Sequence, residues 1–125
     1  CGITATPPNR EIHKSALGAE DSVGWEYAEN TLDAINRPKA GGFGIYAVEQ
    51  VENSIPLSEF TPPPDQKIAL VFGNEIRGIS QEAVDLCHGA LEIPQFGTKH
   101  SFNISVTAGI VLWDIFNKIQ KIRDA

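Results

Sequence analysis

Short apolar runs separated by turn residues predict β-strands along this chain. The clearest run covers residues 67–72, where every side chain from Ile68 onward is apolar, as a strand buried on both faces requires. Other runs rich in β-branched and aromatic residues predict strands at residues 23–28, 43–48 and 91–93, and the tail of one at 1–4. Pro56 and the Pro62–Pro64 run indicate a rigid loop.

Apolar residues at helical spacing predict four helices, at residues 10–18, 29–37, 80–88 and 105–123. Asn9 and Ser80 stand where N-caps are expected, and Pro38 is expected to end the second helix. Because strands alternate with helices, the pattern predicts an α/β fold with a mostly parallel sheet.

The last helix has an unusually wide apolar stripe. Val106, Ile110, Trp113, Phe116 and Ile119 mark one face of it. The residues that widen the stripe are Val111, Leu112, Ile115 and Ile122. Packing against the protein's own core needs a narrower apolar stripe than this. We therefore expect the helix to make a second contact, and the protein to form a homodimer.

Composition narrows the class of protein. A chain of 125 residues suits one domain, which we expect to span residues 1–125. Two cysteines make no disulfide framework, and no apolar run reaches the roughly 18 residues of a membrane span. We therefore predict a soluble, cytoplasmic protein without a membrane partner. The net charge is −6. Binding to the phosphates of a nucleic acid would therefore need a local basic patch or a basic segment outside this chain.

Two segments carry candidate chemistry. The first, Gly73-Asn74-Glu75, directly follows the clearest strand, where open α/β sheets bind ligands and where glycine lets a ligand approach the backbone. A tight turn explains it equally well. The second is a polar loop with Ser101, Asn103 and Ser105 that leads into the long helix. Helix capping explains one of these residues, and not all three.

Both segments resemble sequence motifs of the SpoU class (SPOUT/TrmH type) of RNA methyltransferases. Phe72-Gly73-Asn74-Glu75 with Gly78 resembles motif 2. The residues that resemble motif 3 are Ile93, Pro94, Gly97, Ser101, Asn103, Ser105, Val106, Ala108 and Gly109. Gln95 replaces a frequent methionine and Phe102 a frequent leucine.

The resemblance implies a Rossmann-like SPOUT fold whose C-terminal segment threads a trefoil knot, a feature that is otherwise nearly absent from proteins. The segment after Ile93 is expected to pass through a loop near Gly73. Motif 1, with the family's catalytic arginine, has no match here. Residues 30–37 have the wrong spacing and position. The chain also opens on Cys1 and contains no methionine. We expect the domain to lack its N-terminal part.

The resemblance further implies S-adenosylmethionine as cofactor. The residues expected to contact it are Ala47, Val48, Gly73, Ile93, Gln95, Ser101 and Phe102, with Glu49 beside them. Glu75, Ser101 and Asn103 are the expected catalytic residues.

The implied reaction is methyl transfer to a ribose 2′-hydroxyl of tRNA or rRNA. That hydroxyl is a poor nucleophile, so a base and strict alignment should matter. The three histidines show no ligand spacing, and no metal is expected. Two alternatives remain: a SPOUT enzyme that methylates a base, which the Ser101/Asn103 pattern disfavours, and an adenosine-binding module without catalysis.

Overall fold

The computed structural model describes residues 1–96 and 103–125. These residues form two compact units, Cys1–Ala34 and Ile35–Ala125, and each is described by itself. The expectation of a single domain stays a prediction. In the part of the chain that is described, no helix is both long and apolar enough to cross a membrane.

The first unit contains two short helices, α1 (Arg10–Ala16) and α2 (Ala19–Ser22). The Asn9 side chain begins α1 by accepting hydrogen bonds from the backbone N–H groups of Glu11 (2.9 Å) and Ile12 (3.1 Å). The helix ends at Leu17, which adopts a left-handed conformation with φ of 53°. The predicted helix and its cap are confirmed.

The strands predicted at residues 1–4 and 23–28 are wrong. Both segments are irregular, and one backbone hydrogen bond joins them, from Gly2 N–H to the Ala28 carbonyl (3.0 Å). The Tyr27 hydroxyl adds a second contact by donating to the Gly2 carbonyl (2.7 Å). Apolar alternation fits a strand, but a strand forms only where a neighbour supplies a ladder of hydrogen bonds.

The second unit is built on a four-stranded sheet, with β1 (Gly44–Val48), β2 (Ile55–Pro56), β3 (Ile68–Phe72) and β4 (Gly89–Glu92). The strand order is β2-β4-β1-β3, and every pair is parallel. The predicted α/β fold with a parallel sheet is confirmed. Pro56 belongs to an edge strand and not to the expected loop. An edge tolerates proline because one side needs no ladder hydrogen bonds.

The most buried strand is β1 and not β3. Ile45 and Ala47 of β1 are 0% exposed, whereas all five residues of β3 are only half-buried. Among the described strands β3 pairs with β1 alone and lies at an edge. The prediction that residues 67–72 are buried on both faces is therefore wrong for this chain.

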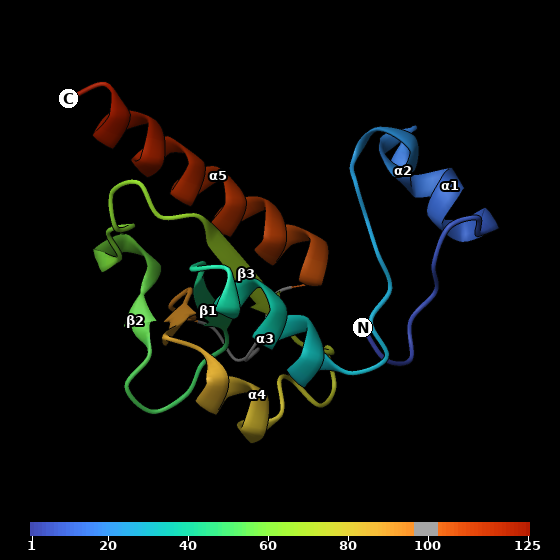
Figure 1. Ribbon diagram of the computed structural model, residues 1–125, viewed down its shortest axis with the longest axis horizontal. Helices are drawn as coiled ribbons and strands as arrows, with labels where there is room; N and C mark the ends of the chain where they lie inside the picture. The colour runs from blue at the N-terminus through green and yellow to red at the C-terminus, as the bar shows by residue number, and fades with distance from the viewer. Residues whose placement is uncertain (97–102) are drawn as a thin grey trace. The chain divides into compact units, whose positions relative to one another are not determined.

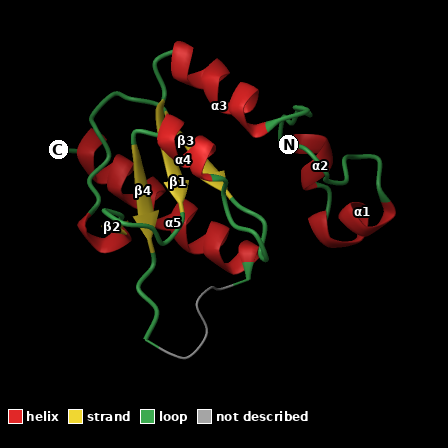
Figure 2. Ribbon diagram, turned by 90° about the horizontal axis from the view of Figure 1, so that it is seen from below, coloured by secondary structure: helices red, strands yellow, loops and turns green. Residues whose placement is uncertain are grey.

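Helices lie on both sides of this sheet (Figures 1 and 2). They are α3 (Thr31–Ala40), α4 (Gln81–Leu86) and α5 (Ile104–Arg123), and the 3-10 turn η1 (Leu57–Glu59) follows β2. In Figure 1, α5 and α4 flank opposite faces of the strands. The predicted Ser80 cap of α4 is confirmed, since the Ser80 hydroxyl accepts a hydrogen bond from Ala83 N–H (3.3 Å).

Pro38 lies inside α3 and does not end it as predicted. Proline removes only one helical hydrogen bond. The turn beyond it is secured by the Arg37 carbonyl, which accepts from Gly41 N–H (3.3 Å), and by the Pro38 carbonyl, which accepts from Phe43 N–H (3.1 Å).

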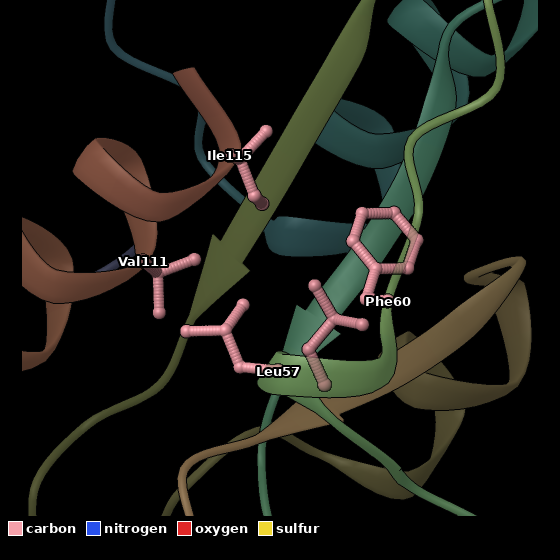
Figure 3. Close-up of a cluster of buried hydrophobic side chains, with 5 residues drawn as sticks. Leu57, Phe60, Val111 and Ile115 are labelled. Atoms are coloured by element: carbon pink, nitrogen blue, oxygen red, sulfur yellow. The ribbon is translucent and has the colours of Figure 1, made fainter. Parts of the chain in front are cut away.

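The main core lies between α5 and the sheet (Figure 3). It consists of Leu57, Phe60, Leu91, Val111 and Ile115. Two of these, Val111 and Ile115, come from the residues that only widen the predicted stripe of α5. The expected main face of α5 is largely exposed, including Trp113 at 68% and Phe116 at 51%. The stripe is thus wider than the core contact, as predicted, but Val111 and Ile115 face the core in place of most of the predicted main face.

Candidate active site

The carboxyl ends of three parallel strands meet at one edge of the sheet. Val48 of β1 pairs with Phe72 of β3 on one side and with Leu91 of β4 on the other. The segments after these residues therefore leave the sheet together, which is where ligands bind in open α/β sheets.

A cavity of about 450 Å³ opens at this edge. It is lined by Val48, Glu49, Gln50, Val51, Phe72, Gly73, Asn74, Glu75, Ile76, Arg77, Gly78, Ile79, Leu91, Glu92, Ile93 and Gln95, and by Ile104 and Thr107 of α5. It thus joins both predicted segments. The volume falls within the roughly 300–1,000 Å³ of small-molecule sites.

Asn74 organises the turn between β3 and α4. Its side-chain oxygen accepts hydrogen bonds from Ile76 N–H (2.8 Å) and Arg77 N–H (3.2 Å). Its backbone exchanges two hydrogen bonds with Gly78, of 3.3 and 2.7 Å. The tight turn expected as the simpler explanation is therefore present, and it forms one wall of the cavity.

Glu49 ties this turn to β1. Its Oε2 atom accepts a hydrogen bond from Ile79 N–H (3.0 Å), and its own N–H donates to the Leu91 carbonyl (3.1 Å). Glu49 thus connects the ends of β1 and β4 with the β3–α4 turn.

Gly73 is required by close packing of the backbone, whereas Gly78 is favoured by its left-handed backbone and by the Glu49 carboxylate beside it. A Cβ atom at Gly73 would lie 2.4 Å from the Gly78 carbonyl carbon and 2.6 Å from the Ile79 nitrogen. A Cβ atom at Gly78, where φ is 67°, would lie 2.6 Å from Glu49 Oε2. Gly73 therefore makes room for the chain's own backbone, which differs from the ligand approach predicted for it.

The charges that line the cavity are mostly negative. Three carboxylates, from Glu49, Glu75 and Glu92, surround it, and Arg77 is the one cation among the described lining residues. Negative charge suits a cationic ligand such as a sulfonium.

The predicted cofactor residues have three different placements. Val48, Gly73, Ile93 and Gln95 line the cavity, as does Glu49 beside them. Ala47 is 0% exposed within the sheet, one residue before the cavity begins. Ser101 and Phe102 lie outside the described residues.

The predicted catalytic residues are also divided. Glu75 lines the cavity and is exposed, and Ser101 lies outside the described residues. Asn103 is the N-cap of α5, where its side-chain oxygen accepts from the Ser105 N–H (2.9 Å) and hydroxyl (2.6 Å). Helix capping thus explains both Asn103 and Ser105, whereas from the sequence we expected it to explain only one residue of this loop.

Several lining residues were not predicted from the sequence. Gln50 and Val51 lie two and three residues after the end of β1, and their place near a strand end was the signal that could have identified them. Ile104 and Thr107 come from the first turn of α5. Thr107 carries no signal of its own, because only the packing of α5 on the sheet brings it to the cavity.

A family model described as the SpoU rRNA Methylase family matches residues 2–113. Among curated proteins, the chain is 31% identical over 105 residues to a tRNA (guanosine(18)-2′-O)-methyltransferase of Borreliella burgdorferi. The match covers 84% of this chain and 47% of that relative. The chain spans about half the length of the curated relatives it matches.

Two solved structures have the same fold. An AdoMet-bound rRNA methyltransferase from Sinorhizobium meliloti superposes with a TM-score of 0.82 at 25% identity, covering 91% of this chain and 42% of that one. A TrmH/SpoU tRNA modifying enzyme from A. aeolicus gives a TM-score of 0.77 at 28% identity, covering 87% and 54%. The chain thus shares its fold with these enzymes.

Proposed function

This chain belongs to the SpoU rRNA Methylase family. We propose that it is part of an enzyme that transfers a methyl group from S-adenosylmethionine to a ribose 2′-hydroxyl of tRNA or rRNA. We propose that this enzyme acts in the cytoplasm.

The observation that carries the proposal is the cavity formed jointly by the two motif segments. Its apolar walls include Val48, Ile79 and Ile93, which suit an adenine ring, and its carboxylates suit a cationic sulfonium. The cofactor supplies an electrophilic methyl group when bound. In this chain, Val48, Gly73, Ile93 and Gln95 would hold it, and Ser101 and Phe102 would complete the site.

The residues proposed to act on the ribose are Glu75, Ser101 and Asn103. Their task is to orient the 2′-hydroxyl toward the methyl group. Asn103 would combine this role with its capping of α5, through the amide group that capping leaves free. Its side-chain oxygen serves the cap, and its NH₂ group remains a donor.

We further propose a homodimer that uses the exposed face of α5. Val106, Ile110, Trp113 and Phe116 present large apolar side chains to solvent, and the rings of Trp113 and Phe116 stack with centroids 6.1 Å apart. An apolar patch of this kind usually marks a contact.

The trefoil knot is also part of the proposal. Support comes from the pair of motif segments joined by β4 and from the family itself. The crossing would involve residues 97–102, which lie outside the described residues.

The test is methyl transfer by the complete protein. Tritium-labelled S-adenosylmethionine is supplied with bulk tRNA or bulk rRNA, and the labelled RNA is digested to nucleosides. The proposal predicts label in a 2′-O-methylnucleoside. Label on a base would indicate a base methyltransferase, and cofactor binding without transfer to either RNA would indicate a non-catalytic adenosine-binding module.

A further inference from the structure

Three exposed side chains stand side by side on the β3–α4 turn, at the cavity. They are Glu75, Ile76 and Arg77. Ile76 is 92% exposed, so it contributes almost nothing to the core of this unit. Ile76 thus leaves a large aliphatic side chain open to solvent next to the cation Arg77.

The backbone that carries these side chains is already fixed. Asn74 accepts hydrogen bonds from the N–H groups of both Ile76 and Arg77, and Glu49 holds the far end of the turn at Ile79. A preorganised turn loses little conformational entropy when it binds a partner. The turn is thus suited to present Ile76 and Arg77 in fixed positions.

The charge of Arg77 is opposite to that of its surroundings. The other charged residues that are described in the cavity wall are glutamates, which suit the cationic cofactor. A guanidinium suits the opposite kind of ligand, and it matches the geometry of a phosphate group. Since the chain carries a net charge of −6, its attraction for an RNA backbone must come from local positions of this kind.

We propose that the β3–α4 turn is an RNA contact, in which Arg77 pairs with a backbone phosphate next to the target nucleotide and Ile76 packs against the adjoining ribose or base. This inference rests on the proposed function, because it needs RNA at the mouth of this cavity. Arg77 is a binding residue in this account and takes no part in the chemical step.

The test is the salt dependence of RNA binding by the complete protein. Filter binding of labelled bulk tRNA, and of bulk rRNA as a second probe, is measured between 50 and 200 mM salt. Each phosphate contact contributes about 0.7–0.9 to the slope of log K against log salt. Arg77→Gln should therefore bind RNA more weakly at 50 mM, and lose about threefold less affinity than the wild type across this range.

Two variants serve as controls, and steady-state kinetics of Arg77→Gln gives a further check. Arg77→Lys should keep the slope, because it keeps the charge. Arg123→Gln removes the same charge at the far end of α5. This position lies roughly 28 Å along the helix from Ile104, which lines the cavity, so the variant should leave the slope unchanged. Arg77→Gln should raise KM for RNA by a larger factor than it lowers kcat.

The possible failures are distinguishable. If the wild type binds RNA with a salt-dependent affinity and Arg77→Gln has the same slope, the RNA contact is refuted while the proposed function stands. If Arg77→Gln or Ile76→Ser dissociates a dimer in sedimentation, the turn contacts a second copy of the chain and the inference is wrong. If the wild type neither binds nor methylates tRNA and rRNA, the proposed function and this inference are both refuted.

Discussion

Gly78 and Glu49 fit together so closely that each explains the other. The carboxylate of Glu49 occupies the space that a Cβ atom at Gly78 would need, and from there it reaches Ile79 N–H. Gly78 also has a left-handed φ of 67°, which glycine adopts without strain. The spacing of Gly73, Asn74 and Gly78 therefore has a mechanical cause within the chain.

Substituting Gly78 with alanine tests both the left-handed backbone at this position and the space that the Glu49 carboxylate occupies. Gly78→Ala should lose about 1–2 kcal/mol from the left-handed conformation, and roughly 1.5–3 kcal/mol more because Glu49 must give up its hydrogen bond. Gly42→Ala is the matched control, since Gly42 has φ of 86° and nothing within 4 Å of its Cβ position. It should show only the first loss in urea unfolding.

A double variant adds a second check. In a Glu49→Ala background the space is free, so Gly78→Ala should cost no more than Gly42→Ala does. An equal cost of Gly78→Ala with and without Glu49 would contradict the coupling.

Asn103 has a capping role in the structure and a proposed catalytic role, and two substitutions distinguish them. Serine caps helices as well as asparagine does, whereas alanine costs about 1 kcal/mol. Asn103→Ser should therefore keep the free energy of unfolding and the cofactor affinity but lower kcat, because the amide NH₂ group is gone. Asn103→Ala should lower both stability and kcat. Wild-type turnover in a stable Asn103→Ser protein would leave Asn103 as a cap only.

At the scale of elements, α5 shows what hydrophobic periodicity predicts and what it leaves open. The spacing predicts the helix to within one residue at its start, and the width of the stripe predicts a second contact. It does not predict which part faces the sheet. Val111 and Ile115 are no more hydrophobic than Val106 and Ile110, so only packing against the strands decides between them.

The exposed part of α5 gives a test of the proposed dimer. Replacing Trp113 and Phe116 together by alanine should raise the dimer dissociation constant by roughly 100-fold or more, since buried aromatic anchors dominate such interfaces. Because both side chains are exposed in the single chain, its stability should change little. Sedimentation of the complete protein measures the first effect and urea unfolding the second.

Ile115→Ala is the matched control on the same helix. This residue is buried in the core, so its truncation should cost roughly 2–5 kcal/mol of stability without a direct effect on the dimer contact. A wild-type protein that sediments as one chain, or a double variant that dimerises as tightly as the wild type, would contradict the proposed interface.

The strands were predictable where the chain supplies the partner. Residues 43–48 and 67–72 are rich in apolar side chains, pair with each other, and form strands nearly as expected. Residues 23–28 have a similar pattern but lack a neighbouring ladder, so the pattern fails there. Pro56 indicated a loop, and yet it pairs in β2 because the hydrogen bonds of an edge strand are needed on one side only.

At the scale of the whole molecule, the position of the site could be predicted better than its composition. The rule that ligands bind beyond the carboxyl ends of parallel strands, together with the motif segments, indicated Gly73 and Ile93 correctly as cavity residues. It could not indicate Thr107, which the chain folds back from a distant helix. Nor could it show that Gly73 accommodates the protein's own backbone.

The central claim is that this cavity holds S-adenosylmethionine, and a calorimetric titration of the complete protein tests it most directly. Thr107→Phe places a ring in the cavity wall and should weaken cofactor binding by roughly tenfold or more, about 1.4 kcal/mol. Lys121→Phe adds the same ring at an exposed position of α5, roughly 21 Å along the helix, and should bind as the wild type does. Wild-type affinity in a folded Thr107→Phe protein, or no binding by the wild type, would contradict the account.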